Sequence, residues 1–220
     1  MLVIVCGLPL TGKSTVSRQI AEDIKGKILR TDVIRKELFK EATLKDVMKS
    51  DDPMLFDLEK VFDVQVTIPD KYQKMIWKQK KMVYDELFHR INALLRERET
   101  VILDGTFYQK NLRKRIYSIT RENSTNVFLI ECYCSEDFIK ERLTRRKKTP
   151  DDASNVDRLH VYLKLKESYE RPVSDNEADS LPLIFYDTGL QKVEMYNIKQ
   201  GNEELKIVIN SIKKLIKKFS

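Results

Sequence analysis

The chain has 220 residues, 34% of them charged, with a net charge of +7 at pH 7 and a pI near 9.1. This length can bury a full core, and we expect one domain over residues 1–220. No apolar run approaches the roughly 18 residues of a membrane span, and the basic charge suits an anionic substrate while indicating nucleic acid only weakly.

The first element is an apolar run at residues 2–6, which predicts a buried strand of a parallel sheet. We expect no signal peptide before it. Residues 7–15 follow as GLPLTGKST and match the phosphate-loop pattern G-x-x-x-x-G-K-[ST]. Apolar residues then recur at helical spacing at Val16, Ile20 and Ile24. This strand, loop and helix context favours a nucleotide site over a chance Gly-rich turn.

Each fixed position of the loop has a physical role. The two glycines allow backbone angles and close approaches that a Cβ would block, and backbone amides wrap the phosphates. Lys13 is expected to reach the β- and γ-phosphates, and the Ser14 hydroxyl to ligate Mg²⁺. The predicted nucleotide-binding residues are Gly7, Leu8, Pro9, Leu10, Thr11, Gly12, Lys13, Ser14, Thr15 and, from a later helix, Arg145.

The second predicted strand, residues 28–31, ends beside Asp32 and is followed one helical turn later by Arg35. Carboxyl ends of parallel strands share one sheet edge, so Asp32 is expected beside the phosphates. There its carboxylate can accept a proton from a substrate hydroxyl, while Arg35 grips an anionic group of that substrate. The alternative is that Asp32 only caps the following helix, and both roles are compatible.

Residues 43–70 show no sustained period and contain prolines, which favours a functional excursion on the acceptor side over a plain loop. Residues 71–98 carry one long apolar stripe, which predicts an amphipathic helix that packs in the core.

The third strand, residues 101–104, ends in Asp104 followed by a glycine. An apolar run ending in a carboxylate is the Walker-B arrangement, which holds Mg²⁺ or its water near Ser14. An ordinary Asp-Gly turn is the alternative.

The fourth strand, residues 127–133, contains one of the three cysteines and is followed closely by another, Cys134. No second pair of metal ligands lies at a suitable spacing, so we interpret the cysteines as structural thiols in a reducing cytoplasm.

Residues 138–158 are expected to form a lid. Arg142 and Arg146 lie four residues apart on one helix face, with Arg145 beside them. Such a run is commonly a solvated basic face. Beside a phosphate loop, we interpret it as a helical lid that brings Arg142 and Arg146 to the transferring phosphoryl group.

The last elements are a strand at residues 183–187 and an amphipathic helix at 202–219, which we expect to dock on the sheet. A membrane-surface helix is the less favoured alternative. Strands that alternate with helices predict an α/β fold with a parallel sheet.

With these motifs assembled, the chain resembles the small P-loop kinases of the polynucleotide-kinase and chloramphenicol-phosphotransferase group over residues 1–171. The resemblance rests on GLPLTGKST, on RTDVIRKEL at 30–38, on VILDGTFYQKNLRKRI at 101–116 and on ERLTRRKK at 141–148. It implies a P-loop NTPase fold of three α/β/α layers, with a five-stranded sheet ordered 2-3-1-4-5. It also implies γ-phosphate transfer from ATP, with Asp32 as general base, Arg35 on a substrate phosphate and Asp104 near the metal.

The L-seryl-tRNA kinases share the same loop and D-x-x-R element, and the basic charge would suit them. Our leading hypothesis is therefore an ATP-dependent kinase acting on a hydroxyl of an acceptor that the sequence does not identify. A nucleic-acid 5′-hydroxyl or seryl-tRNA kinase is one alternative, and a nucleotide-gated regulatory ATPase is another. The sequence does not set the oligomeric state.

Overall fold

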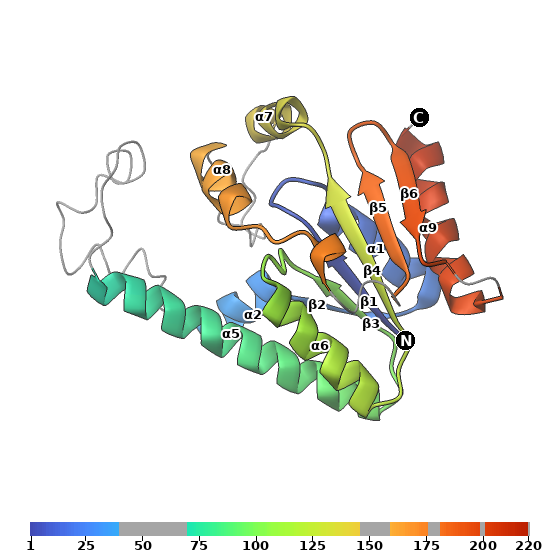
Figure 1. Cartoon of the computed structure of the whole chain (residues 1–220), viewed down its shortest axis with the longest axis horizontal. Coiled ribbons are helices and arrows are strands. Elements are labelled where there is room, and N and C mark those ends of the chain that lie inside the picture. The colour runs from blue at the N-terminus through green and yellow to red at the C-terminus, as the bar shows by residue number, and fades with distance from the viewer. Residues whose placement is uncertain (40–69, 146–158, 176–180, 199–200, 220) are drawn as a thin grey trace.

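A computed structural model describes residues 1–39, 70–145, 159–175, 181–198 and 201–219 (Figure 1). Within them, six strands form one sheet in the order β2-β3-β1-β4-β5-β6. The strands are β1 (Leu2–Cys6), β2 (Lys27–Arg30), β3 (Val101–Asp104), β4 (Val127–Tyr133), β5 (Leu183–Asp187) and β6 (Lys192–Tyr196). The first five are parallel and confirm the expected order 2-3-1-4-5.

The sixth strand was not predicted from the sequence, and it pairs antiparallel with β5. β6 lies at the sheet edge and none of its residues is fully buried, so it lacks the apolar run that marks the buried strands. β1 shows the opposite pattern. It lies between β3 and β4 and all five of its residues are buried, as its continuous apolar sequence predicted.

Helices cover both faces of the sheet and complete the predicted three layers (Figure 1). The described helices are α1 (Lys13–Ile24), α2 (Thr31–Leu38), α5 (Asp70–Arg96), α6 (Lys110–Glu122), α7 (Glu136–Arg145), α8 (Leu159–Glu167), the short 3₁₀ helix η2 (Pro172–Ser174) and α9 (Glu203–Phe219). One core packs α2, α5 and α6 on the sheet, and a second packs α1 and α9 on the other face.

The two long amphipathic helices predicted at 71–98 and 202–219 are thus present as α5 and α9, and α9 docks as expected. Neither these nor any other helix in the described ranges has the length and hydropathy that crossing a membrane requires. The excursion at 43–70 lies outside the described residues except for Asp70, and residues 146–158 of the predicted lid do so as well.

A third, smaller apolar cluster links the phosphate loop to the helices that follow β4. Leu8 of the loop is buried with Ile139 of α7 and Tyr162 of α8. α7 and α8 lie beyond the carboxyl end of β4 (Figure 1). The loop therefore packs against α7 and α8 as well as against the sheet.

Candidate active site

The phosphate loop joins β1 to α1 and has the backbone geometry that its glycines predict. Gly7 has a φ of 135°, and a Cβ there would lie 2.1 Å from the carbonyl oxygen of Cys132. Gly12, the N-cap of α1, has a φ of 85°, and no described side chain caps the helix. The first helical hydrogen bonds run from Thr15 and Val16 to Gly12, so the amides that precede them point to no helical carbonyl. This open helix start is a ready anion site.

The Lys13 side chain folds back over this loop. Its Nζ donates a hydrogen bond of 2.6 Å to the Leu8 carbonyl oxygen. Burial lowers the pKa of Lys13, and the negative charge of Asp104 partly opposes that effect. A phosphate anion would compensate for the lost solvation, so the position suits a group that binds phosphate.

Two carboxylates and one guanidinium meet where β2 and β3 end. Arg30 and Asp104 are paired residues of the two parallel strands. The Asp104 carboxylate is buried, with 5% of the side chain exposed, and its Oδ2 lies 3.2 Å from Arg30 Nε. Arg30 Nη2 donates a hydrogen bond of 3.0 Å to Oδ2 of Asp32. Arg30 thus bridges the carboxylates that the sequence singled out.

Asp32 is the second residue of α2 rather than its N-cap, which is Arg30. Its Oδ1 accepts a hydrogen bond of 2.9 Å from the Val33 amide. One oxygen of Asp32 thus binds a first-turn amide of α2, and the other contacts Arg30. Arg35 follows one turn later and is half-buried. Burial lowers its pKa, while the charge of Asp32 opposes that effect.

The site offers few protein ligands for a metal ion. In the described parts of the chain no group of three or more His, Cys, Asp or Glu side chains is placed to hold a metal ion. Ser14 is the second residue of α1, directly after the loop, and the charge of Asp104 acts on Lys13, the residue before it. A hydroxyl and a carboxylate are oxygen ligands that Mg²⁺ accepts when phosphates and water complete its shell. Ser14 and Asp104 therefore fit Mg²⁺ bound together with a nucleotide.

Arg142 was predicted to act on a transferring phosphoryl group, and in the structure its guanidinium contacts the phosphate loop and Thr188. Its Nη1 donates hydrogen bonds to the Leu10 carbonyl oxygen at 2.8 Å and to Thr188 Oγ1 at 3.0 Å, and Nη2 donates to the Thr188 carbonyl oxygen at 2.9 Å. Arg142 therefore holds the phosphate loop. Arg145 is exposed and pairs with Glu141 at 2.7 Å, and Arg146 lies outside the described residues.

Two residues of the site were missed from the sequence. Thr188 follows β5, and its Oγ1 donates a hydrogen bond of 2.8 Å to the Thr11 carbonyl oxygen. A Cβ added to Gly12 would lie within 3.4 Å of the Thr188 side chain. The second is Arg30. Both lie at the carboxyl ends of predicted strands, and that position is the signal that could have found them.

The cysteines beneath the loop are free and match the structural interpretation. Cys6 and Cys132 are buried. Burial raises the pKa of Cys6 to about 12, so its thiol stays protonated and unreactive near neutral pH.

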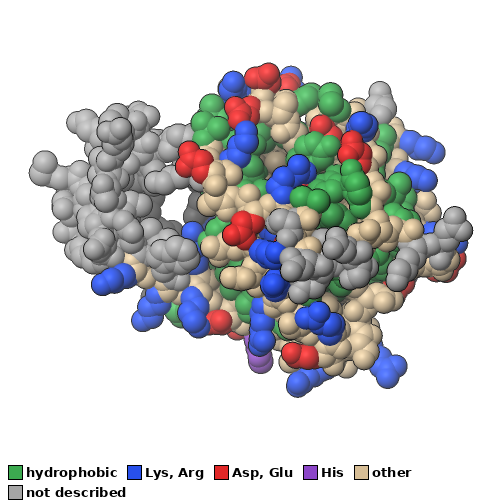
Figure 2. All heavy atoms as spheres, viewed as in Figure 1, with side chains coloured by type: hydrophobic (Ala, Val, Ile, Leu, Met, Phe, Trp, Pro, Cys, Tyr) green, Lys and Arg blue, Asp and Glu red, His purple; other side chains and the backbone are tan. Residues whose placement is uncertain are grey.

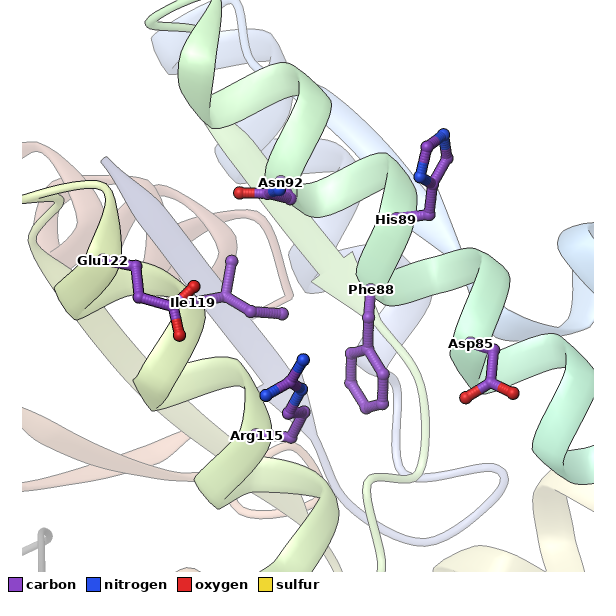
Figure 3. Close-up of a pocket in the computed structure, with 7 residues that line it drawn as sticks. All are labelled: Asp85, Phe88, His89, Asn92, Arg115, Ile119 and Glu122. Atoms are coloured by element: carbon purple, nitrogen blue, oxygen red, sulfur yellow. The ribbon is translucent and has the colours of Figure 1, made fainter.

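A separate cavity of about 390 Å³ lies between α5 and α6 (Figure 3). Phe88 and Ile119 line it together with residues that include His89 and Arg115. It contains no residue of the phosphate loop and neither Asp32 nor Asp104. The cavity is therefore not the phosphate site.

Comparison with known families identifies the chain's relatives. A family model described as an AAA domain, AAA_33, matches residues 2–172. The chain belongs to this family. The match covers the phosphate loop, both site carboxylates, and the described helices up to α8, so the AAA_33 region contains most of the site described above.

Curated relatives of this AAA_33 protein are longer. Uncharacterized proteins of Mycobacterium bovis and Mycobacterium tuberculosis are 24% identical to the chain over 153 residues. That alignment covers 70% of this chain and 27% of each relative. The chain thus spans about a quarter of the length of the curated relatives that it matches.

Solved structures show the fold. A sugar kinase of Janibacter sp. HTCC2649 has a TM-score of 0.53 at 13% identity, covering 97% of this chain and 93% of that one. Kti12 of Chaetomium thermophilum, in complex with ADP-AlF₃, has a TM-score of 0.51 at 18% identity, covering 98% and 97%. The chain therefore has the fold of a P-loop kinase.

Proposed function

We propose that the protein is an ATP-dependent kinase that transfers the γ-phosphate of ATP to a hydroxyl of an acceptor. The observation that carries the proposal is the meeting of three features at one sheet edge. They are the open phosphate loop with Lys13, the Asp32 carboxylate after β2 and the Asp104 carboxylate at the end of β3. A nucleotide-binding loop alone needs no carboxylate after the second strand, whereas phosphoryl transfer to a hydroxyl benefits from a base there.

The chemical step assigns one role to each group. The acceptor oxygen forms a bond to the γ-phosphorus, the bond from that phosphorus to the β–γ bridging oxygen breaks, and ADP leaves with the electron pair. Asp32 accepts the proton of the acceptor hydroxyl. Lys13 and the amides at the start of α1 hold the phosphates and offset their charge. The rate gain comes from positioning and electrostatics, since phosphoryl transfer needs little covalent help from the protein.

Ser14 and Asp104 would hold Mg²⁺, directly or through water. Bound there with the nucleotide, the ion would neutralise negative charge on the phosphates. The Asp104 carboxylate supports this assignment, because it supplies a buried oxygen ligand at the end of β3 to which Arg30 Nε makes no hydrogen bond.

The acceptor is proposed to carry an anionic group, because Arg35 lies half-buried one turn after Asp32. A small anionic alcohol is favoured over a nucleic acid. On the face seen in Figure 2, the Lys and Arg side chains of the described residues are spread out and do not form one continuous basic patch. A strand-binding groove would gather them along one path.

The test is a transfer screen with γ-labelled ATP and Mg²⁺. Candidate acceptors are small alcohols with and without carboxylate or phosphate groups, nucleosides, oligonucleotides and tRNA. We expect label on an anionic small alcohol, and Asp32→Asn should reduce that transfer by about 100-fold or more. Parental transfer by Asp32→Asn would refute the base assignment. Label on an oligonucleotide or tRNA, with binding that weakens steeply in salt, would support the nucleic-acid alternative instead.

A regulatory ATPase is the second candidate, and one observation favours it. Kti12, which shares the fold over nearly the whole chain, was solved with ADP-AlF₃. If this function is correct, the screen will yield label only as free phosphate, and Asp32→Asn will leave nucleotide affinity unchanged.

A further inference from the structure

Arg30 contacts both Asp32 and Asp104. Its Nη2 lies 3.0 Å from Oδ2 of Asp32, and its Nε lies 3.2 Å from Oδ2 of Asp104. The two carboxylates come from different elements, α2 and β3. Without a cation between them, their like charges would repel and the two carboxylates would be free to separate.

The shape of the arginine matters as well as its charge. A guanidinium is planar, so the spacing between Nε and Nη2 is fixed by covalent geometry. Arg30 Nε lies in ion-pair contact with Asp104, which is buried at the end of β3, and the planar group then sets where Nη2 meets Asp32. The Val33 amide holds the other oxygen of Asp32 at 2.9 Å. Together they fix the orientation of the carboxylate.

The contact to Asp104 is also incomplete. Arg30 Nε is buried and has no partner with hydrogen-bond geometry in the described part of the chain, although the Asp104 carboxylate lies beside it. A buried N–H donor without an acceptor costs free energy of folding. With 29% of the Arg30 side chain and 5% of the Asp104 side chain exposed, this is a largely buried ion pair and not a surface one.

We propose that Arg30 is a positioning residue for the transfer reaction. It fixes the Asp32 carboxylate relative to Asp104, and so places the base relative to the phosphate side of the site. This role rests on the proposed kinase function. Arg30 itself touches neither the acceptor nor the nucleotide in this assignment. It acts through Asp32.

The variants are Arg30→Gln, which removes the charge and the fork, and Arg30→Lys, which keeps only the charge. The matched control is Lys27→Gln, which removes a cation from the opposite end of the same strand, where Lys27 pairs with the exposed Glu99. The substrates are γ-labelled MgATP and the acceptor labelled in the screen above. Thermal unfolding of each variant shows whether it is folded.

We expect Arg30→Gln to lower kcat about 10- to 100-fold, with the Kd for MgATP within about 2-fold of the parent. Arg30→Lys should recover only part of that loss, and Lys27→Gln should change neither quantity. In the Asp32→Asn background, adding Arg30→Gln should have little further effect on kcat, because the group through which Arg30 acts is already gone.

Two outcomes would overturn the proposal. One is a folded Arg30→Gln variant with parental kcat. The other is a loss that repeats in full in the Asp32→Asn background, as a general structural role would give. Failure of the underlying function looks different. If no acceptor is labelled, or if Asp32→Asn keeps parental transfer, the kinase assignment falls before Arg30 is tested, and this role falls with it.

Discussion

Arg142 donates a hydrogen bond of 2.8 Å to the carbonyl oxygen of Leu10, across 132 residues of sequence. Leu10 has a positive φ of 67°, which is uncommon for a residue with a side chain. Thr188 holds the next residue of the loop by a hydrogen bond to the Thr11 carbonyl oxygen and also accepts from Arg142. These bonds hold a strained loop in the form that presents its amides to phosphate.

Arg142→Ala should therefore weaken nucleotide binding rather than slow the chemical step. Hydrogen bonds from a charged donor contribute about 1.5–3 kcal/mol, so we expect the Kd for MgATP to rise about 10- to 100-fold. Thr188→Val, which keeps the shape and removes the hydroxyl, should raise the Kd by a smaller factor. Isothermal titration calorimetry measures both.

The control for Arg142 is Lys140→Ala on the same helix, because Lys140 is itself exposed and pairs with the exposed Asp137. It should bind MgATP like the parent. If Arg142→Ala instead binds MgATP like the parent and loses only kcat, the result would support a lid arginine that contacts the phosphoryl group, as predicted from the sequence.

Lys13→Met should have opposite effects on the free protein and on its complex with ATP. Burial lowers the pKa of Lys13 below its ordinary value of 10.5. The unfolded chain therefore binds a proton at Lys13 more readily than the folded chain does. As the pH falls below 10.5, this difference lowers the free energy of unfolding. At neutral pH the nucleotide-free variant should be more stable than the parent.

With MgATP the order should reverse, because only the parent gains a phosphate partner for the ammonium. We expect transfer by Lys13→Met to fall by at least about 100-fold. Thermal unfolding with and without MgATP, at several pH values up to 10, checks both parts. Equal stabilisation of parent and variant by MgATP would show that Lys13 does not meet the nucleotide.

The central strands were predictable because each is marked by its own apolar run, whichever strands it pairs with. Residues 2–6, 101–104 and 183–187 were each expected as buried strands from their apolar runs, and the structure has them with the same bounds. β6 gave no such signal, since an edge strand exposes most of its side chains.

Long-range side-chain geometry was not predictable in the same way. The sequence showed Arg142 near other arginines, and nothing local indicated acceptors at Leu10 and Thr188. The bridge made by Arg30 depends on β2 pairing in register with β3, so that Arg30 lies opposite Asp104. Motif spacing places residues at a sheet edge, but which side chains then meet depends on register and rotamer.

Gly7→Ala should abolish nucleotide binding. The new Cβ would lie 2.1 Å from the Cys132 carbonyl oxygen, a backbone atom of the central strand β4 that cannot move aside. The loop would have to shift away from the sheet. Gly201→Ala is the matched control, since Gly201 also has a positive φ, of 89°, but has open space around it.

For the control we expect a cost of about 1 kcal/mol from backbone strain alone, with unchanged affinity for MgATP. Calorimetric titration and urea unfolding separate the two variants. Normal MgATP binding by Gly7→Ala would mean that the loop tolerates a shift from the sheet, and that its described position is not the binding form.

The last prediction concerns the segment that leads away from α8. Arg113 of α6 and Asp175 are both fully buried and form a two-point ion pair, with nitrogen–oxygen distances of 2.8 and 2.7 Å. Tyr117 donates to the same carboxylate at 3.0 Å, and Arg113 also donates to the Phe107 carbonyl oxygen at 2.7 Å. Burial alone would lower the pKa of Arg113, but the hydrogen bonds and charge of Asp175 raise it, so Arg113 stays charged.

Arg113→Met should destabilise the protein by about 3–5 kcal/mol, because it leaves the Asp175 carboxylate buried without its cation. Adding Asp175→Leu should recover much of that loss, since an apolar pair of similar volume avoids the unpaired charge. Lys81→Ala, which breaks an exposed pair with Asp85 on α5, should cost about 0.5 kcal/mol or less. Urea unfolding measures all three. If the double variant were no more stable than Arg113→Met, the loss would come from the broken packing and the Phe107 contact, and the buried charge would not be its cause.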